Sequence, residues 1–256
     1  MDIIQALILA IIQGISEWLP VSSSGHLVIA QKLMNLQVPV GFDVALHVGT
    51  LAAVIIFMRR EIISILKAAA KLDFKSSEGK NITYIIIATI PAAIAGVLLK
   101  KTFEEMFSSI SAVTAGLMFT GLLLFISERH IKQGGLDGKK SLTIGIMQAV
   151  SIIPGVSRSG STISTGLILG VERETAARFS FLLSIPVVGG AMIVEAGNLI
   201  NSNISSSIII PSILVSGIVG YLSLKFLWKT ILERKFHLFA YYCWILGLIL
   251  VLAQIL

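Results

Sequence analysis

Two short polar stretches interrupt an otherwise apolar chain, and they hold most of the residue types that could do chemistry. The first island runs from Gln13 to His26 and reads QGISEWLPVSSSGH. The second island runs from Pro154 to Thr162 and reads PGVSRSGST. Polar and ionisable side chains are costly in hydrocarbon, so in a membrane they usually serve a site. We therefore predict that the two islands meet and form one active site.

The first island places a carboxylate near hydroxyls and an imidazole. Gln13 and Glu17 are four residues apart, so on a helix they share one face. That face leads into a turn with four further polar residues: Ser22, Ser23, Ser24 and His26. Such a set supplies the parts for nucleophile activation or general acid–base catalysis. The alternative is a buried polar cluster that joins helices, and the serines alone fit that interpretation as well.

The second island offers groups that bind an anion. Arg158 lies between Ser157 and Ser159, just ahead of Gly160 and a helix predicted to begin near Ser161. Backbone N–H groups at a helix start, hydroxyls and a guanidinium together favour a phosphate or diphosphate over a neutral ligand. The alternative is that Arg158 reaches a membrane surface or forms a structural bridge with Glu17.

Other candidates carry less information. Asp43 and His47, four residues apart near the start of a span, are either supporting or gating residues or simply structural. Glu195 is predicted to be interfacial. The single cysteine, Cys243, excludes an internal disulfide and a cysteine metal cluster. No nucleotide-binding glycine loop is present, and no organic cofactor is expected.

The elements that position the islands are membrane helices. Of the 256 residues 55% are hydrophobic and 13% charged, and the mean hydropathy is +0.91. These values predict an all-α integral membrane protein with a single membrane domain over residues 1–256. The N-terminus does not resemble a removable signal peptide. An amphipathic surface helix is predicted within 59–80. Full spans are predicted at about 41–58, 82–99, 110–127, 174–194, 208–229 and 238–255.

Each island is predicted to be the tip of a re-entrant helical hairpin. The paired half-helices are 3–18 with 26–35, and 141–153 with 161–170. Five positions, four of them polar, recur at an offset of 135: Gln13, Ser16, Ser22, Ser24 and Gly25 match Gln148, Ser151, Ser157, Ser159 and Gly160. Three spans between the hairpins make the halves, about 1–127 and 141–256, inverted-topology repeats. The alternative is a chance likeness of two Ser/Gly-rich turns.

The basic residues predict the orientation. Sixteen of the 20 Lys and Arg residues lie toward one side of this topology and three toward the other, while Arg158 lies inside. The positive-inside rule places the richer side in the cytoplasm. Both termini and the entrance to the first hairpin then face outward in a multi-pass plasma-membrane protein. The net charge of +6 is thus a topology signal, and no nucleic-acid partner is expected.

At the two islands the chain resembles the undecaprenyl-diphosphatase family, the bacitracin-resistance type of membrane phosphatase. The matching motifs are Gln13-x-x-x-Glu17, Pro20-Val-Ser-Ser-Ser-Gly-His26 and Pro154-Gly-Val-Ser-Arg-Ser-Gly160. The resemblance implies hydrolysis of undecaprenyl diphosphate to the monophosphate carrier lipid of cell-wall synthesis, at a site open to the outer face. Its partners would be the polyprenyl diphosphate lipid and membrane lipids, and a homodimer is one possible assembly.

Residue by residue, the resemblance implies catalytic roles for Glu17, Ser23, His26 and Arg158. It implies diphosphate-binding roles for seven further residues: Gln13, Ser22, Ser24, Ser157, Ser159, Gly160 and Thr162. Some members have Glu where this chain has Gln13, which weakens any mechanism or metal site that needs two carboxylates. The resemblance also suggests help from Mg²⁺ or Ca²⁺, with Glu17 as a metal ligand. Attack by Ser23, His26 or an activated water stays open. A transporter or flippase, and a membrane scaffold, are the rival functions.

Overall fold

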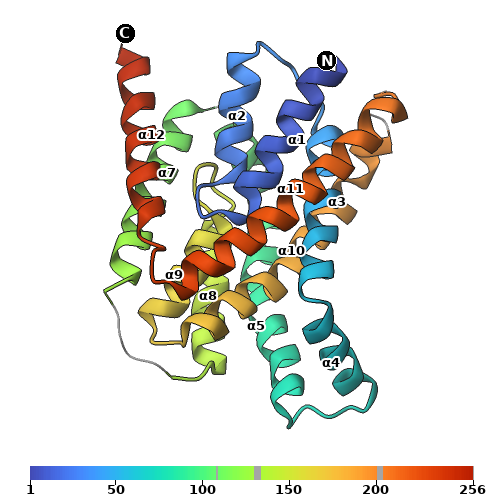
Figure 1. Cartoon of the computed structure of the whole chain (residues 1–256), viewed down its shortest axis with the longest axis vertical. Coiled ribbons are helices and arrows are strands. Elements are labelled where there is room, and N and C mark those ends of the chain that lie inside the picture. The colour runs from blue at the N-terminus through green and yellow to red at the C-terminus, as the bar shows by residue number, and fades with distance from the viewer. Residues whose placement is uncertain (108, 130–133, 201–203, 256) are drawn as a thin grey trace.

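The chain folds into helices throughout the part that the structure, a computed structural model, describes: residues 1–107, 109–129, 134–200 and 204–255. Figure 1 shows the helices and their arrangement. They are α1 (Ile3–Trp18), α2 (Ser23–Leu33), α3 (Val40–Phe57), α4 (Arg59–Ala70), α5 (Ser77–Leu98), α6 (Lys100–Phe107), α7 (Ile110–Ser127), α8 (Gly138–Val150), α9 (Arg158–Ile168), α10 (Arg173–Ile200), α11 (Ser206–Leu232) and α12 (Leu238–Ile255). In the described residues, β-structure is limited to one bridge between Gly134 and Val171. The predicted all-α class is confirmed.

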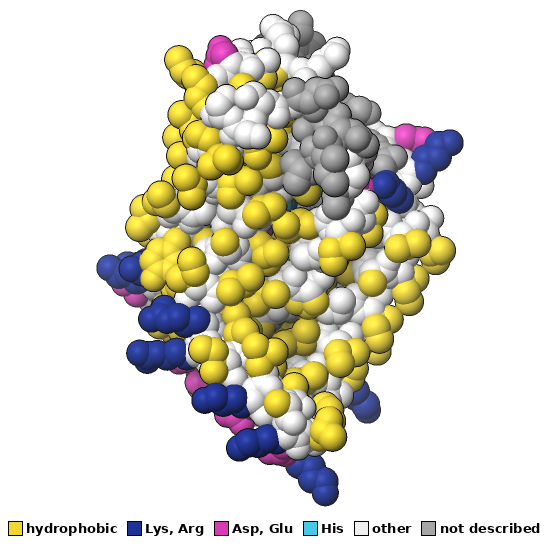
Figure 2. All heavy atoms as spheres, turned by 90° about the vertical axis from the view of Figure 1, so that its right-hand side faces the viewer, with side chains coloured by type: hydrophobic (Ala, Val, Ile, Leu, Met, Phe, Trp, Pro, Cys, Tyr) yellow, Lys and Arg dark blue, Asp and Glu magenta, His cyan; other side chains and the backbone are white. Residues whose placement is uncertain are grey.

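The apolar helices have the length and composition of membrane spans. Within the described ranges, four of them are long and apolar enough to cross a bilayer: α5, α7, the Arg173–Glu195 part of α10, and α11. The helices α3 and α4 meet at Met58 with a bend of 78° and could form a fifth span together, while α1 and α12 are shorter apolar helices. Figure 2 shows hydrophobic side chains across the middle of one face. These features make the chain an integral membrane helical protein.

Both islands break a helix as predicted, although α8 begins and ends three residues before its predicted bounds of 141–153. α1 ends at Trp18, ahead of Pro20, and α8 ends at Val150, ahead of Pro154. The second helix of each pair begins three residues earlier than predicted, α2 at Ser23 and α9 at Arg158. The reason is that serine hydroxyls cap both starts, since Oγ of Ser22 and of Ser157 accepts a hydrogen bond from a backbone N–H three residues later.

Two further differences concern helix ends. α5 begins at Ser77, five residues before the predicted span, because the Ser76 hydroxyl caps it by accepting from the N–H of Gly79. The short helix α6, Lys100–Phe107, was not predicted. It begins directly after α5 in a stretch of mixed charge, where hydropathy gives no span signal.

Helices from the two halves of the chain pack against each other. α1 packs on α11, and α8 packs on α5. Figure 1 shows α11 crossing in front of α1. α3 packs on both α10 and α11, and α7 packs on α12. Glycines allow the closest approaches, because a Cβ at Gly49 would collide with the carbonyl oxygen of Ile213, and one at Gly145 with that of Ala88.

Candidate active site

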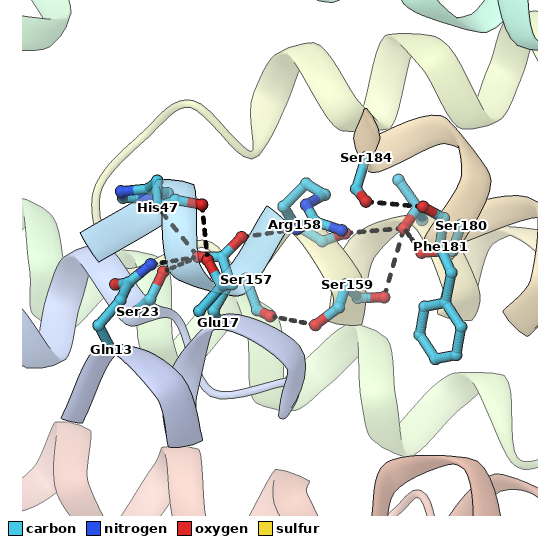
Figure 3. A network of polar contacts seen from close by, with 12 residues as sticks. Gln13, Glu17, Ser23, His47, Ser157, Arg158, Ser159, Ser180, Phe181 and Ser184 are labelled. Carbon is cyan, nitrogen blue, oxygen red and sulfur yellow. Dashed lines mark hydrogen bonds and ion pairs between the residues drawn. The ribbon is translucent and has the colours of Figure 1, made fainter. Parts of the chain in front are cut away.

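The two islands touch at their tips. Nη2 of Arg158, the first residue of α9, donates to Oε1 of Glu17, in the last turn of α1, at 2.6 Å. Oγ of Ser159 donates to the carbonyl oxygen of Leu19 at 3.4 Å. A Cβ at Gly160 would lie only 3.2 Å from Cβ of Pro20. The structure therefore brings the two predicted halves of the site together, as Figure 3 shows.

Glu17 is the centre of the polar network. Besides Arg158, its carboxylate has three neighbours at Oε2: Nε2 of Gln13 at 3.1 Å, Oγ of Ser23 at 2.7 Å and Nε2 of His47 at 3.5 Å. Only 6% of the Glu17 side chain is exposed. A buried carboxylate of this kind is tolerated because each oxygen faces donors or a cation.

Arg158 has bonding capacity left over. Among the described residues, its Nη1 is buried without a hydrogen-bond partner, and so is Oε1 of Gln13. The guanidinium also lies over the ring of Trp18, at 5.0 Å from the ring centroid. Buried polar atoms without partners are rare in folded proteins. Here the unused Arg158 donor is the feature expected where an anionic ligand completes the site.

The other hydroxyls of the islands mostly stabilise the two helix starts. Ser22 Oγ lies 3.2 Å from Ser24 Oγ, and Ser157 Oγ lies 3.2 Å from Ser159 Oγ. Thr162 lies one turn into α9, where its hydroxyl donates to the carbonyl oxygen of Arg158 at 2.8 Å. It also lies 2.6 Å from the Ser180 hydroxyl of α10. These residues orient the backbone N–H groups and Arg158, and in this state their hydroxyls do not bond Glu17.

The helix α7 holds the second break in place. Thr120 Oγ1 donates to the carbonyl oxygen of Gly155 at 3.2 Å and accepts from the N–H of Ser157 at 3.0 Å. Gly155 has φ +88°, a conformation that a residue with a side chain rarely adopts. The backbone at Pro154 and Gly155 also packs directly against Gly116 of α7, where a Cβ would collide with the carbonyl oxygen of Pro154. Contacts with α7 therefore hold the backbone that leads to Arg158 in position.

His26, predicted as catalytic, points away from Glu17. Its Nδ1 lies 2.8 Å from the carbonyl oxygen of Ser22, and its Nε2 lies 2.7 Å from the hydroxyl of Tyr242 in α12. The His26 and Tyr242 rings are nearly parallel, at 11°. Both residues line a groove of about 680 Å³ between α1, α11 and α12. The structure does not bring His26 into the Glu17 network.

Three contributors were undervalued or missed by sequence reasoning. His47, one of the weaker candidates, lies beside Glu17, and its signal was the helical spacing from Asp43. Trp18 carries no chemical signal in an apolar helix, yet it is 1% exposed and its ring lies under the Arg158 guanidinium. Tyr242 had no signal, because only the fold brings α12 to the first island.

Comparisons with known proteins agree over almost the whole chain. The family model described as bacitracin resistance protein BacA matches residues 6–249. Undecaprenyl-diphosphatases from Methanosphaera stadtmanae and Methanobrevibacter smithii are each 40% identical, over 100% of this chain and 99% of theirs. One from Korarchaeum cryptofilum is 41% identical over 97% of this chain and 98% of its own length. A match this complete is more than a shared motif, and the chain belongs to the bacitracin resistance protein BacA family.

Proposed function

We propose that this protein removes the terminal phosphate from undecaprenyl diphosphate and releases undecaprenyl phosphate and inorganic phosphate. The observation that carries the proposal is the contact between Glu17, Ser23 and Arg158 across two helix breaks in a membrane protein. The family match and the relatives' names support the substrate. A buried carboxylate, a hydroxyl and a guanidinium with an unused N–H donor fit phosphoryl transfer, in which proteins mainly position groups and stabilise charge.

Ser23 is the hydroxyl best placed to attack. Its Oγ donates to Oε2 of Glu17 at 2.7 Å, which is the geometry of a nucleophile beside its base. In the proposed first step the Ser23 oxygen bonds to the terminal phosphorus, the bond to the bridging oxygen breaks, and Glu17 takes the hydroxyl proton. Undecaprenyl phosphate leaves with the bridging oxygen. Water then hydrolyses the phosphoserine and releases inorganic phosphate, and Ser23 recovers its proton.

Arg158 and the two helix starts are the charge-stabilising groups. The guanidinium has its unused Nη1 donor, and α2 and α9 both begin at the islands, so their N-terminal N–H groups favour an anion there. Donors that are already fixed cost no reorganisation when negative charge develops on the phosphoryl oxygens. Ser22, Ser157 and Ser159 support these starts through their caps and hydroxyl pairs.

A divalent cation fits this site as a companion of the diphosphate. In the described residues, no group of three or more His, Cys, Asp or Glu side chains could hold a metal ion. Glu17 and the buried, unpaired Oε1 of Gln13 are the oxygen atoms that Mg²⁺ or Ca²⁺ would meet here. Such hard cations take six or more oxygen ligands, so phosphate oxygens and water would complete the set. The cation would neutralise phosphate charge.

We also propose that the site opens to the outer face. α1 begins and α12 ends at the same end of the molecule in Figure 1, and on the face in Figure 2 most Lys and Arg side chains gather toward the opposite end. The positive-inside rule makes that basic end cytoplasmic. Six spans with two re-entrant hairpins in inverted repeats would fit the packing of α1 on α11 and of α8 on α5. The two matching serine pairs support the same repeat.

Phosphate release from a long-chain polyprenyl diphosphate in detergent tests the function. The purified parent would be compared with Glu17→Ala, Arg158→Ala and His26→Ala, each checked for folding, with and without Mg²⁺ or Ca²⁺. We expect release by the parent and a loss of about 10²-fold or more for Glu17→Ala and Arg158→Ala, the scale of removing a catalytic group. A folded parent that releases no phosphate would exclude the proposed phosphatase activity. Rapid acid quenching with labelled substrate would show whether Ser23 carries the phosphoryl group.

A further inference from the structure

Ser22 has a strained backbone conformation directly before the proposed nucleophile, Ser23. Its φ is +72°, which a residue with a side chain rarely adopts. Ser157, the matching cap of the second island, has φ −75°. The capping bond is the same at both positions, since each hydroxyl accepts from a backbone N–H three residues later. The strain is therefore no requirement of capping, and between these two caps it belongs to the one that precedes Ser23.

A conformation of this kind persists only where neighbouring groups hold it. The carbonyl oxygen of Ser22 accepts from the N–H of His26 at 3.2 Å, and Nδ1 of the His26 ring lies 2.8 Å from the same oxygen. Because a carbonyl oxygen can only accept, Nδ1 carries a proton. In the neutral ring Nε2 then has a lone pair, and the Tyr242 hydroxyl, 2.7 Å away, donates to it. A path of hydrogen bonds thus runs from α12 to the strained residue.

The helix α12 contacts the first island at a second point. Sγ of Cys243, the residue after Tyr242, donates to the carbonyl oxygen of Pro20 at 3.6 Å. The second island offers a comparison, because Ser161 stands there at the offset of 135 from His26. Among the described residues, the buried Ser161 hydroxyl has no hydrogen-bond partner. The side-chain bond that holds the cap therefore occurs at the strained break, and its counterpart is missing at the relaxed one.

We propose that Tyr242 is a positioning residue: through the His26 ring it holds the turn that aims Ser23. The inference rests on the proposed function and adds a residue to it. The carbonyl of Ser22 belongs to the planar peptide unit that leads into Ser23, so its direction sets where the Ser23 side chain points. With the path intact, Ser23 Oγ stays 2.7 Å from Oε2 of Glu17. Without the path, Ser22 would relax to an ordinary φ and the hydroxyl would leave its base.

Two other roles for Tyr242 predict different kinetics. A residue that only packs α12 against the bundle would change thermal unfolding and leave turnover alone. A residue that binds substrate from the groove, which Tyr242 also lines, would change KM. A positioning residue changes kcat instead, because the substrate still binds while the attacking oxygen lies in the wrong place.

Phosphate release from a long-chain polyprenyl diphosphate in detergent separates these roles. Tyr242→Phe removes the hydroxyl and keeps the ring. Tyr241→Phe is the matched control, since the two tyrosines are neighbours on α12 and are 46% and 47% exposed. We expect Tyr242→Phe to lower kcat by about 10- to 100-fold, the scale of a misplaced reacting group, with KM and thermal unfolding close to those of the parent. Tyr241→Phe should keep the parent's kcat.

The outcomes for the two proposals are distinguishable. An active parent whose kcat is matched by both Tyr242→Phe and Tyr241→Phe would overturn the positioning role and leave the phosphatase intact. A rise in KM without a fall in kcat would do the same, because it would make Tyr242 a substrate contact. A parent that releases no phosphate would instead overturn the proposed function, and the positioning role with it.

Ser22→Gly tests whether the strained turn is the link. Glycine adopts a positive φ without strain, and replacing a serine cap by glycine costs a helix little. Tyr242→Phe added to Ser22→Gly should therefore lower kcat by about threefold at most, because no strained residue is left to hold. Equal losses from Tyr242→Phe in the parent and in the Ser22→Gly background would overturn the proposal.

The ¹⁵N NMR signals of the histidine rings give a readout that does not depend on turnover. His26→Gln identifies the His26 signals by their disappearance. The Nε2 signal should move in Tyr242→Phe, because its lone pair loses a donor, and should stay in place in Tyr241→Phe. A lowered kcat in Tyr242→Phe with unmoved His26 signals would show that the effect does not pass through this ring, and would overturn the proposal.

Discussion

Arg158 and Glu17 lie 141 residues apart in the chain, and Nη2 of the one lies 2.6 Å from Oε1 of the other. This is the bond that joins the two islands through charge. Each partner alone would be a charged group buried at a helix break, and together they compensate each other. The working site therefore exists only when both halves of the protein are folded and docked.

The first prediction concerns the shape of the Arg158 side chain. Arg158→Lys keeps the positive charge but loses the planar fork that can bond Glu17 and a phosphate oxygen at the same time. We expect phosphate release to fall by about 10²-fold. Arg60→Lys, at an exposed position in the first turn of α4, is the control and should behave like the parent. Equal activity of Arg158→Lys and the parent would show that only charge matters at this position.

The second prediction separates two neighbouring hydroxyls. Ser23 donates to Glu17, whereas Ser24 pairs with the Ser22 hydroxyl. Ser23→Ala should therefore abolish phosphoenzyme formation and lower turnover by about 10²-fold or more, since it removes the attacking group. Ser24→Ala should retain most of the activity. The comparison is made by single-turnover release of labelled phosphate, and the reverse order of effects would argue against Ser23 as the nucleophile.

The third prediction concerns the hydrogen bonds by which Thr120 of α7 holds the second island. Thr120→Val removes a hydroxyl that serves the carbonyl of Gly155 and the N–H of Ser157, and leaves both buried without that partner. We expect a loss of about 1–3 kcal/mol in the free energy of unfolding, the cost of an unsatisfied buried polar group. Thermal unfolding in detergent measures it. Thr143→Val, at an exposed position of α8, is the matched control and should change stability little.

The fourth prediction concerns the close approach of α3 and α11. Gly49→Ala would push a methyl group into the backbone of α11 at Ile213 and should destabilise the protein by about 1–3 kcal/mol, as overpacking does. Gly190→Ala is the control, because a Cβ there meets no atom within 4 Å. If both variants unfold at the same temperature, the two helices can separate at Gly49 without cost.

The sequence predicted the helix breaks because proline, glycine and serine act locally, and it predicted the meeting of the islands because buried polar groups in a membrane need partners. The polar atoms that converge on Glu17 from Gln13 and Ser23 also come from one short stretch, so spacing alone could place them. The sequence could not predict that the His26 side chain turns toward α12. It depends on Tyr242, 216 residues further along, and no local pattern reports where α12 packs.

The helix starts and Trp18 show the same difference between local signals and contacts that depend on the fold. The serine caps that set the starts of α2 and α9 are local, and recognising the capping pattern would have placed both starts correctly. The placement of Trp18 under the Arg158 guanidinium is different, since an aromatic residue in an apolar helix is compatible with core, interface or cation contact. Only the docked second island decides among these.

The distance along the chain between Glu17 and Arg158 also bears on how the protein is made. A ribosome synthesises Gln13, Ser23 and His47 long before it reaches residue 158, so the carboxylate of Glu17 first meets these partners. The guanidinium arrives only after α7 and α8. A truncated chain that stops before the second island thus carries an incompletely neutralised acid at a helix break. In the finished protein the Arg158 guanidinium compensates that charge, so the first half of the chain depends on the second for its electrostatic balance.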